Sequence, residues 1–519
     1  MDATLQRQLA WLERDAACLV GMRRGLEKEA LRVQPDGWLA QTPHPRALGS
    51  TLTHPYITTD YSEALIELIT PACGSIDQAL GWLDDLHRHV YAHIGEERLW
   101  VNSMPCKLGP DDNIPLAQYG SSNIGRMKTL YRHGLGLRYG RRMQTIAGIH
   151  YNLSFPETFW RRWQGEAGAV GELQAFMSAR YLGLVRNFQR RSWLLLYLLG
   201  ASPAVCGTFL EGREHGLQSL PSGTLYLPEA TSLRMSKLGY QNDAQSGLHV
   251  SYNALDEYIH DLDSAIRTPY PPYEAAGVVR DGVWQQINAN ILQIENEYYG
   301  LIRPKRTIRS GERPTQALAR RGVEYVELRC VDLDPFEPLG IGVDSAHFLE
   351  VFALHCLLTD SPAFRPTDYD RLPENQQAMV ERGRDPGLVL NDCSGRHRFR
   401  DLAARLFDEL QSVAEVLDAA HATSAYTQAL ARQRDKLRDP ALTGSARVLE
   451  AMSAAGHGFY GFAQERADRI RDEMLARPLP ADRERELSGA AGASLAAQAD
   501  LEAQPQLPFA EFLDRYFAD

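Results

Sequence analysis

The sequence predicts an α+β protein whose strands lie in the first two-thirds of the chain and whose last third is helical. Segments with the alternation or composition of strands recur between residues 25 and 331, whereas the chain beyond residue 402 is rich in Ala, Arg, Glu and Leu. Strands and helices that are segregated along the chain favour α+β over a doubly wound parallel sheet. The 519 residues contain no internal repeat and no phosphate-binding loop of the GxxxxGKS type.

The first elements follow an opening amphipathic helix. Gly25–Val33 is predicted to be a strand, and a Pro-Asp-Gly turn leads into a returning strand at Trp38–Ala40. A second strand is expected at Tyr61–Ile69. A helix follows it, because Ser75 and Gln78 fit a capping box ahead of apolar residues at helical spacing.

The middle of the chain alternates between strands and helices. Further strands are predicted at Thr145–Ser154, Ile287–Tyr299 and Val323–Val331, and a long helix at Leu173–Leu199. The Pro/Arg/Asp-rich passage Asp360–Gly395 is expected to be a loop. We expect a single catalytic body over residues 1–519, with a sheet-containing part at about 1–340 and a mainly helical part at about 341–519.

Composition narrows the classes of partner. The formal net charge of -11 argues against nucleic acid as the main partner, because phosphate backbones attract basic surfaces. The most apolar run, Trp193 to Cys206, is interrupted by Gly and Pro and falls short of the ~20 residues that span a bilayer. The N-terminus lacks the pattern of a signal peptide, and no C-x-x-C pair indicates zinc. We therefore expect a cytoplasmic monomer that acts on small molecules, without a membrane or nucleic-acid partner.

Ionisable residues stand at alternate positions of four predicted strands, so that each set shares one face of its strand. They are Glu27 with Glu29, Glu63 with Glu67 just after Asp60, His150 with Asn152, and Glu327 with Arg329. Carboxylates clustered on one sheet face repel each other unless cations neutralise them. Oxygen ligands with one imidazole suit Mg²⁺, or Mn²⁺ as the alternative. The pattern predicts a multi-metal carboxylate site that also holds ATP phosphates.

Other interpretations of these residues stay open. A lone Glu in a strand is usually a solvated outward residue, which is a competing reading for Glu63, Glu295 and Glu297. A carboxylate cluster also fits two-metal phosphate hydrolysis. Two segments are candidate phosphate or carboxylate binders, with solvated loops as the alternative: the basic cluster Arg303, Lys305, Arg306 and Arg309, and the Gly-containing tract Tyr119–Lys128.

Several strings resemble, in order, the sequence blocks of the proteobacterial type of glutamate–cysteine ligase, also named γ-glutamylcysteine synthetase. The opening strings are RGLEKEALR at Arg24–Arg32 and THPYITTDY at Thr53–Tyr61, continuing through Glu67. Later blocks are Tyr119–Lys128, Met143–Asn152, Ala230–Tyr240, Gln293–Arg306 and Glu324–Arg329. The resemblance extends to about Pro338 and more thinly to the end, where Pro508-Phe509-Ala510 is similar to the family's C-terminal helix.

The resemblance implies a glutamine-synthetase-like fold, in which a curved antiparallel sheet forms a funnel lined by acids and surrounded by helices. It also implies Mg²⁺ ligands at Glu27, Glu29, Asp60, Glu67, His150 and Glu327. Arg329, with Glu327, is expected at the transferred phosphoryl group. Independently of the resemblance, Lys305 and Arg306 of the basic cluster are the candidates for the nucleotide phosphates. Arg234 and His150 are expected at the substrates, and the cysteine pocket at Tyr131, Tyr240 and Tyr299 with Tyr61 beside them. The family typically has Phe in place of Tyr61.

The implied activity is the ATP-dependent ligation of the L-glutamate γ-carboxylate to the L-cysteine amine through γ-glutamyl phosphate. Its products are γ-glutamylcysteine, ADP and phosphate, and the reaction is the first step of glutathione biosynthesis. Three alternatives remain at this point: a ligase of the same fold that uses another amine, a metal-dependent phosphohydrolase, and a catalytically silent binding protein.

Overall fold

The main sheet of the computed structural model, which describes residues 2–105, 107–238, 243–309, 311–456 and 458–518, has seven strands. Six run in the order β11-β12-β5-β1-β3-β2, and β4 pairs with β1 beside them. All neighbours are antiparallel. The bounds are β1 Arg23–Val33, β2 Ile57–Thr59, β3 Leu65–Ile69, β4 Arg98–Leu99, β5 Ile149–Ser154, β11 Ile302–Lys305 and β12 Tyr325–Val331.

Strand β1 is the centre of this sheet, and its length brings two partners into register with the acids. On one side Glu27 lies opposite His150 of β5, and on the other Glu29 lies opposite Glu67 of β3. Successive residues of a strand point to opposite faces, so these side chains project from the same face while Leu26, Ala30 and their neighbours join the core. The predicted sharing of one face by Glu27 and Glu29 is confirmed.

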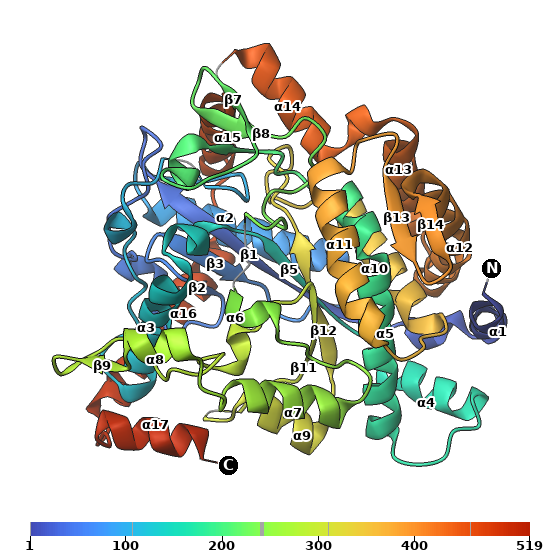
Figure 1. Cartoon of the computed structure of the whole chain (residues 1–519), viewed down its shortest axis with the longest axis horizontal. Coiled ribbons are helices and arrows are strands. Elements are labelled where there is room, and N and C mark those ends of the chain that lie inside the picture. Colours follow the sequence, from blue (N-terminus) through green and yellow to red (C-terminus); the bar gives the residue numbers. More distant parts are fainter. Residues whose placement is uncertain (1, 106, 239–242, 310, 457, 519) are drawn as a thin grey trace.

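Helices pack around the main sheet, and a group of them lies to one side of it (Figure 1). Helix α2 Ile76–His93 packs on β1 and β3, and Ser75 caps it by accepting a hydrogen bond from the Gln78 amide at 3.2 Å. Helix α5 Leu173–Leu198 packs on β11 and β12 and on α10 Val343–Leu358. In Figure 1, α5, α10, α11, α12 and α13 gather to one side of the main sheet.

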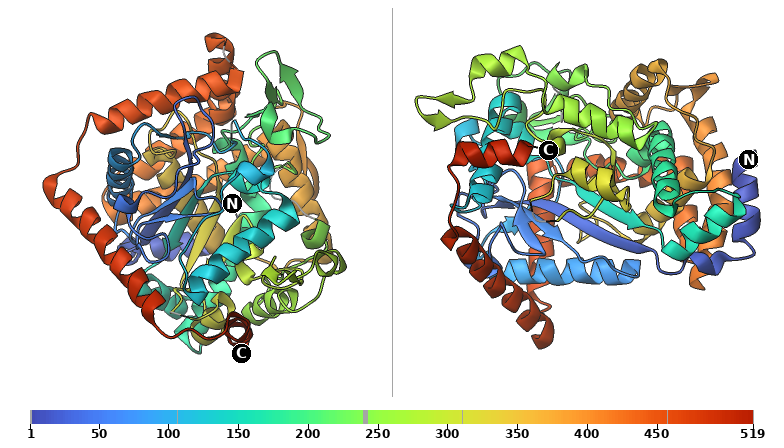
Figure 2. Two further views of the ribbon diagram at one scale, coloured as in Figure 1. Left: turned by 90° about the vertical axis from the view of Figure 1, so that its left-hand side faces the viewer. Right: turned by 90° about the horizontal axis from the view of Figure 1, so that it is seen from below.

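The remaining elements surround this frame. The other helices are α1 Ala3–Leu12, α3 Asn123–Tyr139, α4 Glu157–Glu166, α6 Asp243–Ser246, α7 Leu255–Ala265, α8 Pro271–Ala276, α9 Pro314–Arg321, α11 Pro366–Arg382, α12 Phe399–His421, α13 Ala425–Arg438, α14 Gly444–Ala455, α15 Gly458–Leu475, α16 Ala481–Ala503 and α17 Phe509–Phe517. The small sheets contain β6 Ala204–Cys206, β7 Gln218–Leu220 and β8 Thr224–Tyr226, then β9 Val279–Arg280 with β10 Val283–Trp284, and β13 Val389–Asp392 with β14 Gly395–Arg398. Figure 2 shows α16 beside α2, against which it packs. No helix among the described residues is long and apolar enough to cross a membrane.

The α+β prediction is confirmed, but two predicted segments are wrong. Ile287–Tyr299 is not a strand; side chains bond its main chain, as when Gln293 accepts from the Ile287 amide at 3.0 Å, and a 3-10 helix covers Glu295–Glu297. The expected loop Asp360–Gly395 contains α11 and β13. Pro366 stands at the start of α11, where a missing amide hydrogen costs no helical hydrogen bond, so proline there begins the helix.

One predicted hairpin and one predicted strand are shorter than expected. The return at Trp38–Ala40 is a single bridge between Val33 and Leu39. The expected strand Tyr61–Ile69 begins only at Leu65, because a turn between β2 and β3 occupies residues 60–64. This turn places Asp60 and Tyr61 at the end of the hairpin instead of within a strand.

Candidate active site

A cavity of about 320 Å³ opens over the acidic face of the main sheet. Side chains from five strands of the main sheet line it: β1, β3, β5, β11 and β12. The predicted site residues that line it are Glu27, Glu29, Asp60, Tyr61, Glu67, Tyr131, His150, Arg234, Tyr299, Lys305, Glu327 and Arg329. Tyr240 lies outside the described residues, and Arg306 is not among the lining residues.

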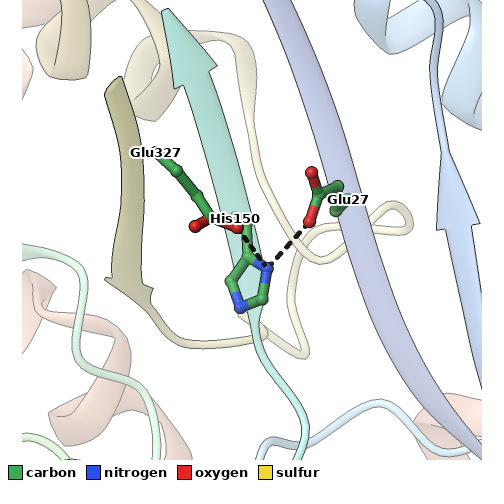
Figure 3. Close-up of side chains that lie close together, drawn as sticks. All are labelled: Glu27, His150 and Glu327. Atoms are coloured by element: carbon green, nitrogen blue, oxygen red, sulfur yellow. Dashed lines mark hydrogen bonds and ion pairs between the residues drawn. The ribbon is translucent and has the colours of Figure 1, made fainter. Parts of the chain in front are cut away.

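The tightest group in the cavity joins Glu27 of β1, His150 of β5 and Glu327 of β12 (Figure 3). His150 Nδ1 lies 3.0 Å from Glu27 Oε2 and 3.5 Å from Glu327 Oε1. One ligand atom from each of the three residues lies within 4.8 Å of the others. Antiparallel pairing of β1, β5 and β12 produces this group from residues up to 300 positions apart, so local sequence alone does not reveal it.

Two further carboxylates lie beside this group. Glu29 Oε1 is 4.0 Å from His150 Nε2, and Glu29 Oε2 accepts a hydrogen bond from the Gly148 amide at 2.8 Å. Burial raises the pKa of Glu29, and burial with the charges of Glu27, Asp60 and Glu29 raises the pKa of Glu67 well above its usual value. The carboxylates therefore crowd one another, which is the electrostatic signature expected of a cation site.

Glu327 meets the basic side of the cavity. Arg329 Nη1 donates to its Oε1 at 3.0 Å, and Lys305 Nζ lies 3.3 Å from its Oε2. Burial alone would raise the pKa of Glu327, but the charges of Lys305, Arg329 and His150 hold it well below its usual value. Glu327 Oε2 is buried, and apart from its ion pair with Lys305 it makes no hydrogen bond to a described residue.

Arg234 is 2% exposed and is held by main-chain oxygens next to the acids. Its Nη2 donates to the Arg329 carbonyl at 2.9 Å, its Nη1 donates to the Val331 carbonyl at 3.3 Å, and Nη1 lies 3.6 Å from Asp332 Oδ1. The guanidinium packs directly against Gly148, where a Cβ atom would overlap it. A rigid guanidinium in such a position suits a carboxylate ligand.

Tyr61, Tyr131 and Tyr299, the described tyrosines of the predicted set, also line the cavity. Tyr299 Oη donates to Met235 Sδ at 3.2 Å, and burial raises the pKa values of Tyr61, Tyr131 and Tyr299, which keeps their hydroxyls protonated. The Tyr61 hydroxyl is buried and makes no hydrogen bond to any residue that the structure describes.

Arg306 and Glu63 do not have the surroundings that the sequence suggested. Arg306 donates to the Arg321 carbonyl at 2.8 Å and lies 3.5 Å from Glu324, away from the cavity. Glu63 is buried and accepts from the amides of His44 and Gln118, both at 2.9 Å, so it is a structural residue and not a solvated one.

The basic cluster partly belongs to a strand instead of following one. Arg303 and Lys305 both lie in β11 and both line the cavity. Glu295 is buried against Arg313 at 2.9 Å, whereas Glu297 lines the cavity and pairs with Arg138 at 3.0 Å. The solvated reading of these two acids is therefore wrong.

Some lining residues were absent from the predicted set. Leu135 and Tyr139 of α3 join Tyr131 at spacings of four, and this helical periodicity was a usable signal. Arg132 donates to the Asp60 and Lys128 carbonyls, and no pattern in the sequence points to that contact. The others are Met143, Gln144, Gln245 and Asn296.

Comparison with known proteins points to one family. The sequence profile of the glutamate–cysteine ligase family matches residues 9–379. A glutamate–cysteine ligase of Alcanivorax borkumensis is 54% identical, covering 99% of both chains, and one of Pseudomonas paraeruginosa is 49% identical, covering 100% of this chain and 98% of the relative.

Two solved structures share the fold. A glutamate–cysteine ligase of Francisella tularensis, in complex with AMP, matches with a TM-score of 0.90 and 38% identity, over 96% of this chain and 98% of its own. A bifunctional glutathione synthetase of Pasteurella multocida matches with a TM-score of 0.70 and 25% identity, over 91% of this chain and 55% of its own. The profile match and the full-length relatives together show that this chain belongs to the glutamate–cysteine ligase family.

Proposed function

We propose that this cavity joins the γ-carboxylate of glutamate to the amine of cysteine at the expense of ATP, which is converted to ADP and phosphate. The observation that carries the assignment is the meeting of carboxylates from β1, β3, β12 and the turn at Asp60 with buried Arg234 and half-buried Arg329, in a member of this family. The Francisella relative was solved with AMP, which supports a nucleotide in the equivalent cavity.

The acidic residues fit Mg²⁺, with Mn²⁺ as the alternative. The donor set is five carboxylates and one imidazole, and Glu327 Oε2 lacks a hydrogen-bond partner among the described residues. We assign the metal ligands to Glu27, Glu29, Asp60, Glu67, His150 and Glu327. When bound, Mg²⁺ would neutralise phosphate oxygens and polarise the transferred group.

The chain's own residues position the reacting groups and neutralise the charge of the phosphoryl oxygens. A carboxylate is a poor acyl donor, so a γ-carboxylate oxygen attacks the γ-phosphorus of ATP and ADP leaves, which gives γ-glutamyl phosphate. Arg329 and Lys305, both beside Glu327, offset charge on the phosphoryl oxygens as this bond forms.

In the second step the cysteine amine attacks the activated carbonyl, and phosphate leaves with its bonding electrons. Arg234 holds the glutamate by a carboxylate, so the reacting carbon stays in place for the attack. Several acids lie near the amine's position, and we assign the base to none of them.

Tyr131, Tyr240 and Tyr299, with Tyr61 beside them, form the proposed cysteine pocket. Packing alone separates a thiol from a methyl or hydroxyl group by about 1–3 kcal/mol. We therefore expect measurable turnover of 2-aminobutyrate. Strict rejection of that amine would contradict a selectivity based on packing.

We propose that the chain works as one catalytic body and as a cytoplasmic monomer. The helices α15 and α16 pack back on α2, which itself packs on the main sheet, and this supports a single body. Light scattering of the purified protein tests the monomer, because a mass of twice 58.2 kDa would contradict it.

The test is ADP formation by the purified protein with Mg²⁺, with glutamate and cysteine omitted in turn. We expect turnover only when both amino acids are present, with γ-glutamylcysteine as the product. ADP formation that needs neither amino acid would indicate a phosphohydrolase instead. A faster rate with another amine would keep the ligase chemistry and overturn the assigned substrate.

A further inference from the structure

A second cavity lies among α5, α11, α12 and the β13–β14 hairpin. Its volume is about 350 Å³, and it shares no lining residue with the active site. These elements form the group beside the main sheet in Figure 1. A volume of this size matches that of pockets for small organic ligands, which begin at about 300 Å³.

Four arginines from three helices line this cavity. Arg190 and Arg191 come from α5, Arg371 from α11 and Arg405 from α12. The other side is apolar and contains Trp193, Leu372, Leu390, Leu402 and Leu406. The cavity therefore combines guanidinium groups with an aromatic and aliphatic surface.

Two of these arginines have incomplete hydrogen bonding. Arg190 donates to the Pro362 carbonyl at 2.8 Å, yet its Nη1 is buried without a hydrogen-bond partner among the described residues. Arg371 donates to Asp368, and its Nε is likewise buried and unpartnered within the described chain. Burial, together with the charges of Arg186, Arg191 and Arg371, lowers the pKa of Arg190 to about 10 despite Asp368.

The other two arginines are half-buried Arg191 and exposed Arg405, and the charge of Arg191 helps to lower the pKa of Glu409. Within the described part of the chain, neither Arg191 nor Arg405 has a carboxylate within 4.0 Å, and neither side chain makes a hydrogen bond. Both carboxylates that line the cavity bind other groups. Glu409 lies 2.9 Å from His355 Nε2, and Asp392 accepts from the Ser394 amide at 2.7 Å.

Hydrogen bonds join two of the elements that line the cavity, α11 and β13. Asn375 and Asn391 bond each other through the Asn375 side chain, which donates to the Asn391 carbonyl at 2.5 Å and accepts from its amide at 2.9 Å. The two amides therefore hold α11 against β13, and the arginines project from elements that are already packed.

We propose that this cavity binds a small organic anion, a carboxylate or phosphate monoester that carries an apolar or aromatic group. The anionic end pairs with Arg191 and Arg405, since planar guanidinium groups bind such oxygens with two parallel hydrogen bonds. The apolar body lies on Trp193 and the leucines. This site is separate from the active site and does not depend on the proposed function.

Calorimetric titration of the full chain with phenyl phosphate and with phenylacetate tests the proposal. Benzyl alcohol is the neutral control for the ring. We expect at least one anion to bind and the alcohol not to, and the double variant Arg191→Gln/Arg405→Gln to weaken binding about tenfold or more, as the loss of charged hydrogen bonds implies. Arg485→Gln, an exposed arginine of α16, is the matched control and should bind as the unmodified chain does.

Ligase activity of the double variant should equal that of the unmodified chain, which shows that the fold is intact. Three results would overturn the proposal: no binding of either anion at about 10 mM, equal binding of benzyl alcohol, or undiminished binding by the double variant. Binding that disappears only with Arg329→Ala would place the anion in the active site and would also overturn it.

Discussion

Replacing Gly148 by alanine would displace Arg234 without changing any charged residue. Gly148 immediately precedes β5, and a Cβ atom there would overlap Nη2 and Cζ of Arg234 and lie 2.7 Å from its Nε. Ordinary contacts begin at 3.4 Å, so Nε alone must retreat by 0.7 Å (3.4 less 2.7), and the overlapping atoms must move further. The main-chain bonds of Gly148 to Glu29 do not require glycine and are retained.

The displaced guanidinium would lose its hydrogen bonds to the carbonyls of Arg329 and Val331, and with them its alignment to the substrate. A hydrogen bond to a charged group contributes about 1.5–3 kcal/mol. If Arg234 holds the glutamate carboxylate, kcat/KM for glutamate should fall about 10- to 150-fold, because each 1.4 kcal/mol is a factor of ten. The KM for cysteine should change much less.

The assay is the initial rate of ADP formation with glutamate varied at saturating cysteine and ATP. Gly81→Ala in α2 and Gly165→Ala in α4 are matched controls, since a Cβ atom at either position has no heavy atom within 4 Å. Both controls should retain the glutamate kinetics of the unmodified chain. A folded Gly148→Ala variant with unchanged glutamate kinetics would refute the role of Arg234, and an effect on cysteine alone would move Arg234 to the other substrate.

Three further predictions concern the metal ligands, the core and acid stability. Glu27→Gln, Glu67→Gln and Arg329→Ala should each remove most turnover while the melting temperature stays near that of the unmodified chain; near-normal turnover in all three would contradict the site assignment. Glu350→Gln should lower the free energy of unfolding by about 3–5 kcal/mol in urea titrations, because Glu350 is fully buried against Arg24 at 2.7 Å and removing one charge leaves the other unpaired. Tyr426→Phe, which removes one hydrogen bond to the same carboxylate, should cost only about 0.5–1.5 kcal/mol, and equal losses would argue against the ion pair as the cause. Burial, with the charges of Arg32 and His54, lowers the pKa of His44 to about 4 from 6.5. Between pH 6.5 and 4 the unfolded chain therefore binds more protons than the folded chain. The free energy of unfolding should fall by up to roughly 3 kcal/mol as the pH drops through this range. His44→Gln should flatten the dependence of the melting temperature on pH, and an unchanged slope would exclude His44 as its source.

The parts of the site that were predictable share a local origin. Glu27 and Glu29, or Glu327 and Arg329, are two residues apart in strands, and the alternation of a strand places them on one face whatever the sheet around them. The same alternation singled out Glu67, just after Asp60, and the family resemblance supplied Arg234 and the tyrosines; most of these residues line one cavity. Local patterns also predicted the start of α2 and both ends of α5 within a few residues.

The two wrong predictions have different physical causes. Ile287–Tyr299 has the composition of a strand, but side chains such as Gln293 satisfy its amides locally and leave no edge for pairing. In Asp360–Gly395 the prolines suggested a loop, although Pro366 occupies the first turn of α11, where proline is compatible with a helix. Composition alone does not distinguish these arrangements.

The sequence by itself determined the family, the α+β class and the residues that share a strand face, since these depend on local periodicity and on ordered motifs. Only the tertiary structure decided which faces meet: Glu27 opposite His150, Glu29 opposite Glu67, and Lys305 of β11 beside Glu327. It also decided that Arg306 turns away from the cavity while Arg303 faces it. The physical reason is that strand register is set by the burial of apolar side chains across distant segments, and a shift of one residue would turn every acid to the opposite face.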